Sequence, residues 1–468
     1  MNKFHSTVSR RDFMKALGLG VGAVSAAGVA IPAFKDIDDM ITSTPKQVYP
    51  WWIKERDYDD ISTDVDWSVF KVYNNTAGGG ERANDVPAPN MDVYEKNTIQ
   101  RDSRRAAGRP GFSIRDRALA DIFPGMSTAG ITVTPSAPIE TDQSGKAVKW
   151  NISPEDNFIT LRAALHWIGS HSVGAFVLND KTRRLYNQNT TFNGDDGQAH
   201  NNINLQRDAQ WVITYGTHQN YEQKRMELIS ADDNDKLNGH PTDLGRAAPY
   251  RAYNDAQYSE HQFMRFITGL GWYASTAGQG PNVPFGIFAG NGEQSRTCHL
   301  MTPHFGIMTR RSISFTTNMP IEPRKPMDFG GTRFCKSCRR CAERCPTYAM
   351  GDEKYTETNY DTGPGHRPGF KGWRLDWGLC KSANSPSYCG SCHGICPFNH
   401  QSDALIHKMV RFTASSTSLF NKFFGMGDRF MRFAEPQTDK TLEDWWYRDL
   451  KTYKGDSILG GGLYQWML

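Results

Sequence analysis

The chain has almost no cysteine outside its last third. Eight of its nine cysteines lie between Cys335 and Cys396, and Cys298 is the only one that precedes them. A site built from several cysteines is therefore excluded from the first two thirds of the chain. A single cysteine such as Cys298 is more often a buried packing residue than a ligand.

A strong excess of one charge is also missing. The formal net charge is +4, and residues 1–33 carry a net +3, so about +1 remains for the rest of the chain. Proteins that bind nucleic acid usually present a clear excess of basic residues. No nucleic-acid role is therefore expected.

Long apolar runs are absent after residue 33. No later segment reaches the roughly 18 uncharged apolar residues that a membrane-spanning helix needs. Membrane association of this part of the chain would therefore require a partner protein.

The start of the chain has the pattern of an export signal. It reads Ser9-Arg10-Arg11-Asp12-Phe13-Met14-Lys15 and continues as an uncharged, Gly- and Ala-rich stretch from Ala16 to Ala33. This pattern predicts a twin-arginine signal. A retained transmembrane anchor is the alternative, but the low hydrophobicity of the stretch favours cleavage. Because this pathway carries folded proteins, a cofactor inserted in the cytoplasm would survive export.

The cysteines form two runs with the spacing of iron–sulfur ligands. The first is Cys335-x2-Cys338-x2-Cys341-x3-Cys345-Pro346, and the second is Cys380-x8-Cys389-x2-Cys392-x3-Cys396-Pro397. In two-cluster ferredoxins the fourth cysteine of each run ligates the other cluster. One [4Fe–4S] cluster is therefore predicted on Cys335, Cys338, Cys341 and Cys396, and the second on Cys345, Cys380, Cys389 and Cys392.

Cysteines in exported proteins have two other common uses. Structural zinc favours paired CxxC ligands, and disulfides form in exported proteins. Neither of them requires a CxxCxxCxxxCP run, so iron–sulfur clusters are favoured. The eight residues between Cys380 and Cys389 depart from the standard spacing, and the ligand loop must bulge there.

Helices and strands are expected mainly in the middle of the chain. Residues 34–150 are irregular and suggest an extended wrapping region, and residues 184–208 are polar and suggest a surface loop. One helix is expected to start at Ser153, and a second to run from Ala248 to Ala274 with Tyr253 on its apolar stripe. Strands are expected at Val173–Leu178, Trp211–Tyr215 and Ile313–Thr317.

A Gly-rich stretch follows the long helix. It includes Gly278, Gln279 and Gly280, and then Phe285 and Gly290. Glycines at this density allow backbone to approach a large flat ligand closely, although a simple tight loop is the alternative.

The order of these features resembles one enzyme family. A twin-arginine signal, a Gly-rich segment ending in Gln294-Ser295-Arg296, the stretch Thr317-Asn318-Met319-Pro320 through Lys325-Pro326-Met327-Asp328-Phe329-Gly330, and the two cysteine runs follow one another. This combination is similar to that of the respiratory reductive dehalogenases, over nearly the whole chain. The resemblance implies a catalytic subunit that replaces a carbon-bound halogen by hydrogen as terminal reductase of anaerobic respiration.

The resemblance also implies the fold and cofactors. It suggests an α+β protein with a nitroreductase-like α/β core that binds a cobamide in its base-off form, and a C-terminal ferredoxin-like module with two [4Fe–4S] clusters. The sequence has no Asp-x-His-x-x-Gly motif, the usual source of a lower-axial histidine. The expected division is 1–33 signal, 34–150 wrapping region, 151–325 cobamide-binding core, 326–405 cluster module and 406–468 C-terminal helical segment.

Residue roles follow from the same resemblance. Tyr253 corresponds to the proton-donating tyrosine, Arg296 to the active-site arginine and Gln279 to an amide over the substrate. A guanidinium beside a phenol stabilises the phenolate, which makes the phenol a better acid. Trp373 and Trp377 are candidates for an aromatic wall around the halocarbon. The expected cobamide contacts are Gly278, Gly280, Phe285 and Gly290.

The expected partners are a halogenated organic substrate, a small hydrophobic membrane-anchor subunit and an upstream respiratory electron donor, with a homodimer as a further option. The protein would sit on the outer face of the cytoplasmic membrane, attached peripherally. Two alternatives stay open, an epoxyqueuosine-reductase-like cobamide enzyme and a non-enzymatic exported electron carrier. The export signal argues against the first, and the long region before the cysteine runs argues against the second.

Overall fold

The computed structural model describes most of the chain between residues 49 and 447. The described residues are 49, 52–72, 88–122, 131–170, 172–186, 190–193, 197–199, 202–227, 241–276, 282–350, 366–384, 389–399, 405–430 and 437–447. The expected signal at residues 1–33 and the residues Gly278, Gln279 and Gly280 lie outside these ranges. In the described part of the chain, no helix is both long and apolar enough to span a bilayer.

The centre of the molecule is a four-stranded antiparallel sheet. Its strand order is β2 (Ser172–Val177), β6 (Trp211–His218), β10 (Thr309–Thr317) and β7 (Ala274–Ser275). The three longer strands include most of the residues predicted from the sequence, and β10 starts four residues before the predicted Ile313. Smaller pairings join β1 (Lys54–Glu55) to β11 (Met327–Asp328) and β8 (Glu293–Gln294) to β9 (Leu300–Met301).

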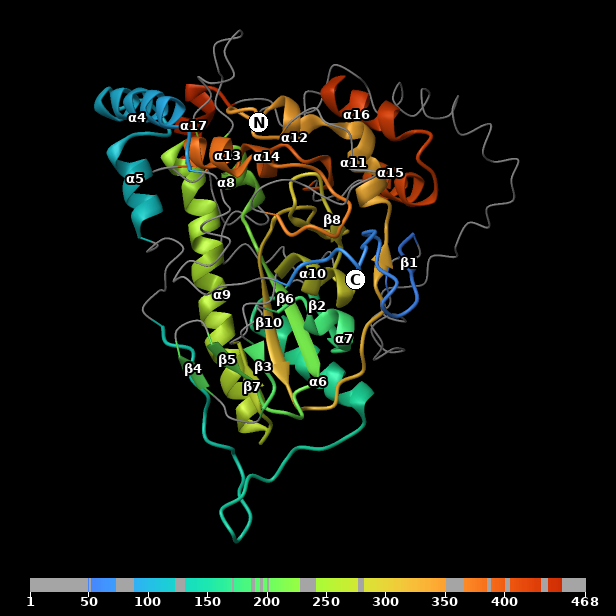
Figure 1. Cartoon of the computed structure of the whole chain (residues 1–468). Coiled ribbons are helices and arrows are strands. Elements are labelled where there is room, and N and C mark those ends of the chain that lie inside the picture. The colour runs from blue at the N-terminus through green and yellow to red at the C-terminus, as the bar shows by residue number, and fades with distance from the viewer. Residues whose placement is uncertain are drawn as a thin grey trace.

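Two long helices cover one face of this sheet (Figure 1). Helix α6 (Pro154–Trp167) starts as expected, with the Ser153 side chain accepting a hydrogen bond from the backbone of Asp156. Helix α9 (Asp243–Gly269) is capped by Thr242 and begins five residues before the expected Ala248, with Pro249 inside it. Their apolar stripes meet odd-numbered strand residues in one core: Phe158, Leu161, Leu165, Val173, Ala175, Ile213, Tyr215, Phe263, Ile267, Ile313 and Phe315.

The opposite face packs against α10 (Asn282–Phe288) and against Leu178 and Leu185, which flank α7 (Asp180–Arg183). Here the even-numbered strand residues Phe176 and Val212 meet Phe285 and Phe288. Full burial of each such side chain contributes roughly 1.5–3 kcal/mol. The polar excursion expected as a loop at 184–208 contains a small sheet of β3 (Thr190–Thr191), β5 (Asn202–Asn204) and β4 (Gly197–Ala199).

The cysteine runs lie on short helices at one end of the molecule, at the top of Figure 1. These helices are α11 (Gly331–Cys338), α12 (Arg340–Glu343), α13 (Trp377–Asn384), α14 (Ser391–Gly394) and the 3₁₀ turn Pro397–Asn399. Around them lie α8 (Tyr221–Arg225), α15 (Leu405–Ser416), α16 (Asn421–Phe430) and α17 (Asp439–Trp445).

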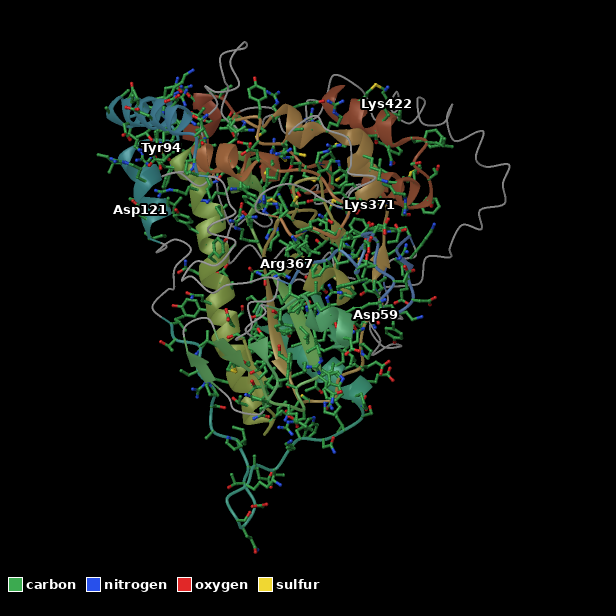
Figure 2. The ribbon with its side chains drawn as sticks, in the orientation of Figure 1. Asp59, Tyr94, Asp121, Arg367, Lys371 and Lys422 are labelled. Carbon is green, nitrogen blue, oxygen red and sulfur yellow. The ribbon has the colours of Figure 1, made fainter. Side chains whose placement is uncertain are left out.

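The N-terminal region is more ordered than the sequence suggested. The expectation of an extended wrapping region missed α4 (Met91–Ala106) and α5 (Ile114–Asp121). The residues that α4 buries include Asn97 and Arg101, so an apolar stripe does not mark it. Residues 64–66 lie beside residues 369–371, because the backbone N–H of Asp66 donates to the Gly369 carbonyl and that of Lys371 donates to the Asp64 carbonyl. Figure 2 labels Lys371, whose ammonium lies 2.8 Å from the Asp64 carboxylate.

Candidate active site and cluster-binding module

Four thiols converge on one cavity beside α11. Cys335 and Cys338 come from α11, Cys341 from α12 and Cys396 from the turn after α14, and all four line the same cavity. Burial raises the pKa of the Cys335 thiol to about 11. Thiols in such a site ionise only when a cation compensates their charge, so this donor set fits an iron–sulfur cluster. We call it the cluster 1 site.

The other four cysteines form a second group. Burial raises the pKa of Cys392 well above its ordinary value, and the neighbouring thiols Cys389, Cys380 and Cys345 raise it further. Cys380, with its unusual spacing, lies on α13 and is thus brought to the same group. We call Cys345, Cys380, Cys389 and Cys392 the cluster 2 site. The crossed pairing expected from the sequence is therefore the pairing that the fold brings together.

All nine cysteines are free of disulfides. In the part of the chain that is described, no three cysteine, histidine or acidic side chains gather tightly enough to hold one metal ion. The ninth cysteine, Cys298, packs against the cluster 2 site and donates to the Trp373 carbonyl at 3.4 Å. Its pKa is raised to about 12 by burial. It is therefore an uncharged packing residue, as the sequence suggested.

Tyr253 lies under a guanidinium, but the guanidinium belongs to Arg310. Arg310 Nη2 donates to Tyr253 Oη at 2.9 Å, and the guanidinium carbon lies 4.8 Å from the centre of the phenol ring. The pairing of β10 with β6 shifts register between Thr309 and Arg311, so Arg310 occupies an irregularity in the ladder. Bulges of this kind often redirect a side chain at an active site.

Arg296 has a different set of contacts. Its Nη2 and Nε atoms donate to the Cys335 carbonyl at 2.9 and 3.2 Å, and its guanidinium lies 5.0 Å from the ring centre of Trp373. It is 4% exposed and lines the cluster 1 cavity. The sequence argument that a guanidinium adjoins Tyr253 therefore holds for Arg310, a residue that it did not name. The signal that could have found it is the Arg310-Arg311 pair, which precedes the predicted strand at Ile313–Thr317 and lies inside β10 in the structure.

The two predicted tryptophans lie against the cluster module. Trp373 is 2% exposed beneath Arg296, and Trp377, the first residue of α13, packs beside Cys380 and Cys392. Their role as walls of a substrate pocket stays a prediction.

The described cobamide candidates have packing partners of their own. Phe285 is 1% exposed between Phe176 and Tyr186, with ring centres 5.3 and 5.0 Å away. Gly290 has φ +73°, and a Cβ there would lie 2.4 Å from the Lys325 carbonyl oxygen. These contacts account for both residues without a bound ligand, so cobamide contact stays a prediction.

A buried charged group lies between Arg310 and the cluster 2 site. Lys224 and Glu227 form an ion pair at 2.5 Å with both side chains fully buried. The ring centres of His299 and His393 lie 4.5 Å apart. The pKa of His299 is lowered to about 4 by burial and then by the positive charge of Arg310. Burial lowers the pKa of His393 as well, so both histidines are uncharged polar residues of the interior.

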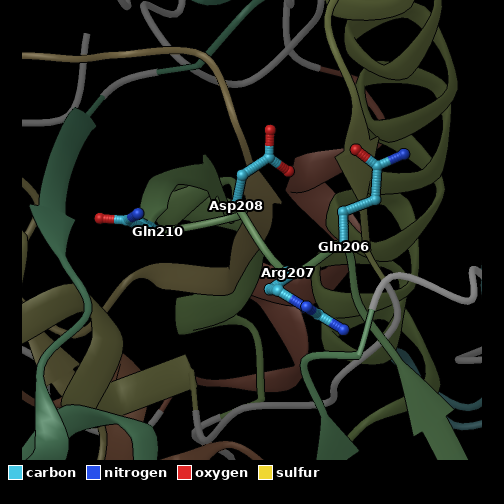
Figure 3. A pocket seen from close by; sticks show the side chains of 4 residues that line it. All are labelled: Gln206, Arg207, Asp208 and Gln210. Atoms are coloured by element: carbon cyan, nitrogen blue, oxygen red, sulfur yellow. The ribbon is translucent and has the colours of Figure 1, made fainter.

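A second hollow lies far from this chemistry. It opens beside the loop before β6 and is lined by Gln206, Arg207, Asp208 and Gln210 (Figure 3). Asn318 donates to the side chains of Gln206 and Asp208, which ties this loop to the end of β10. With no sulfur or aromatic lining, the hollow has no feature of a redox site.

Comparison with known proteins covers the whole chain. A chloroethene reductive dehalogenase of Dehalococcoides mccartyi is 28% identical, over 97% of this chain and 99% of that protein. A trichloroethene reductive dehalogenase of the same species is 26% identical, over 95% of this chain and 97% of that protein. Over nearly its whole length, the chain is similar to reductive dehalogenases.

Two further matches concern the cysteine-rich segment and the fold. Residues 334–399 match the model of a 4Fe-4S double cluster binding domain, which lies inside the expected module at 326–405. A solved reductive dehalogenase, described in connection with B12-dependent dehalogenation, shares the fold with a TM-score of 0.51. It is 20% identical, and the match covers 81% of this chain and 49% of that chain.

Proposed function

We propose that this protein replaces a carbon-bound halogen by hydrogen and releases halide, as the terminal reductase of anaerobic organohalide respiration. The reaction consumes two electrons and one proton for each carbon–halogen bond. The observation that carries this proposal is the hydrogen bond from Arg310 to Tyr253, made in a chain that also presents eight thiols in two groups. One side of the site can thus provide a proton, and the other can bind redox clusters.

Two kinds of cofactor supply the reducing power. When bound, a cobamide would supply a strong reductant at cobalt, and two [4Fe–4S] clusters would supply single electrons. Cys335, Cys338, Cys341 and Cys396 would hold one cluster, and Cys345, Cys380, Cys389 and Cys392 the other. For the cobamide we propose a nitroreductase-like core as its site, with Gly278 and Gly280 as its candidate contacts.

The protein's own residues handle the proton. Tyr253 holds it on Oη, within hydrogen-bonding distance of Arg310. When the phenol gives up this proton, the adjacent guanidinium stabilises the phenolate. Gln279 would orient the substrate, and Trp373 and Trp377 would exclude water around an apolar halocarbon.

The expected location and partners complete the proposal. A twin-arginine signal would export the folded protein to the outer face of the cytoplasmic membrane. A small hydrophobic anchor subunit would attach it there, and an upstream respiratory donor would reduce the clusters. A homodimer is a further proposal. Because the curated relatives are named for chloroethenes, a small chlorinated alkene is the first substrate class to test.

Anaerobic reconstitution tests the function directly. Protein loaded with iron, sulfide and a cobamide should release halide and the dehalogenated product in equal amounts when a reduced viologen is supplied. Protein with clusters but no cobamide is the control and should release neither. A fully loaded protein that retains no corrinoid would favour an electron carrier. Corrinoid retention with activity only on epoxyqueuosine would favour the other enzyme class.

A further inference from the structure

A buried carboxylate holds the start of the helix that carries two cluster 1 thiols. Glu293, on β8, is 1% exposed, and its Oε2 atom accepts hydrogen bonds from the backbone of Gly331 at 2.7 Å and Phe329 at 3.2 Å. Gly331 is the first residue of α11, which carries Cys335 and Cys338. The N-terminal end of a helix attracts negative charge, and its first N–H groups lack partners within the helix.

The residues after Glu293 continue this contact along α11. The Thr332 hydroxyl donates to the Gln294 carbonyl at 2.8 Å, and Arg296 donates to the Cys335 carbonyl at 2.9 Å. Residues 293–296 therefore fix both the first turn and a ligand-bearing residue of α11. Glu293 is the only one of them that adds negative charge.

The charges facing Glu293 leave this carboxylate partly uncompensated. The pKa of Glu293 is raised to about 7, first by burial and then by the negative charge of Asp328 on β11. Arg333 on α11 acts in the opposite direction, but its guanidinium is paired with Asp328 at 2.5 Å. Arg56 lies 3.7 Å from the same aspartate. The partner strand β9 is apolar and is preceded by His299, whose lowered pKa keeps it neutral.

We propose that Glu293 is a positioning residue that sets the reduction potential of cluster 1, and that it binds a proton when this cluster accepts an electron. The electron adds one negative charge to the site, and the proton on Glu293 Oε2 removes one. Above the range where the carboxyl holds its proton, the ionised carboxylate repels the incoming electron. The potential of cluster 1 should therefore fall as pH rises. The donor of the electron is the respiratory donor in the cell and dithionite or a reduced viologen in the test.

The test is a redox titration followed by electron paramagnetic resonance, on protein loaded with both clusters but no cobamide. In the wild type, one of the two couples should become more negative between pH 6 and 8. The limit is 59 mV per pH unit, the value for one proton per electron. Glu293→Gln keeps a carbonyl oxygen that can accept both backbone hydrogen bonds but removes the charge. This variant should raise the potential of that couple at pH 8, remove its pH dependence and leave the second couple unchanged.

Asp116→Asn is the matched control. Asp116 is also a buried carboxylate at the start of a helix, where it forms a capping box with Ser113 on α5. This change should affect stability but neither potential. A wild-type potential that does not change with pH would overturn the proposal, even if Glu293→Gln fails to hold its iron. Equal shifts of the potentials of both couples would also overturn it. Because the proposal rests on the clusters alone, it can fail while the dehalogenase function stands, and the reverse also holds.

Discussion

Tyr253 and Arg310 meet although 57 positions separate them in the chain. The tyrosine comes from the middle of α9, and the arginine from the irregular start of β10, two elements that pack against each other. The phenol can therefore be recognised from the helical stripe and the family resemblance, but its cationic partner depends on strand register. A one-residue shift in a strand moves side chains to the opposite face, and sequence periodicity alone does not fix it.

Replacing Tyr253 by Phe tests the proton donor. The change removes only the hydroxyl, so iron and corrinoid content should match the wild type. The dehalogenation rate should fall about 100-fold or more, the usual effect of losing a general acid. Tyr258→Phe, on the same helix but 55% exposed, should leave the rate unchanged. Wild-type turnover in Tyr253→Phe would refute the assignment.

Substitutions of Arg310 and Arg296 should have different effects on turnover and on iron content. Arg310→Gln removes the cation beside Tyr253 and should lower kcat about 100-fold, the size expected for loss of a preorganised electrostatic contact. Arg296→Gln removes the contact to the Cys335 carbonyl and should instead weaken cluster 1, seen as lost iron and an altered paramagnetic signal. Parallel assays of iron content and halide release distinguish the two. The reverse pattern would restore Arg296 to the catalytic role expected from the sequence.

Among the elements, strands and apolar helices could be predicted and polar helices could not. β2 and β6 are rich in apolar residues, Ile313 and Phe315 of β10 alternate with polar residues, and α6 has a Ser153 cap, so local chemistry is enough to locate these elements. Helix α4 packs on α13 through Asn97, whose amide donates to the Ser382 carbonyl at 3.2 Å. That contact exists only after the chain has folded, so no local sequence pattern predicts it. The cluster 1 site shows both cases. Its cysteines could be predicted as ligands from their spacing, but the contact of Glu293 with the start of α11 could not be predicted from the sequence.

Gly330 offers a test of how α11 is held in place. It caps the helix with φ +78°, and a Cβ would lie 2.1 Å from the Ala414 carbonyl oxygen on α15. Gly330→Ala should therefore separate the two helices and lower both the unfolding temperature and the iron content. Gly427→Ala is the control, because nothing lies within 4 Å of its Cβ position inside α16. Since Ala favours a helix over Gly by up to about 1 kcal/mol, this control should be neutral or stabilising. Equal loss of iron in both variants would contradict the packing argument.

At the scale of the whole molecule, the N-terminal region contacts the cluster module through β1, through residues 64–66 and through α4. β1 pairs with β11 directly before α11, and residues 64–66 pair with the segment that precedes α13. Helix α4 then packs on α13 itself. These contacts connect the N-terminal region to the cluster module. The central sheet has one core under α6 and α9 and a second under α10, and Phe70 of the N-terminal region also packs into the second. Loss of the clusters should therefore loosen the N-terminal region before it loosens the sheet.

Hydrogen exchange after iron removal tests this order. When chelator and oxidant strip the clusters, α11 to α14 lose the bonds that hold their cysteines, and metal binding energy that supported folding is lost with them. Amides of α4 and β1 should then exchange at least about tenfold faster, a change of about 1.4 kcal/mol in local stability. Amides of β6 and β10 should keep their protection, because their core contains no cluster ligand. Asn97→Ala in the iron-loaded protein should accelerate exchange in α4 alone, since it removes one docking contact and no thiolate bond. Uniform loss of protection across the sheet would mean instead that the clusters support the fold of the entire chain.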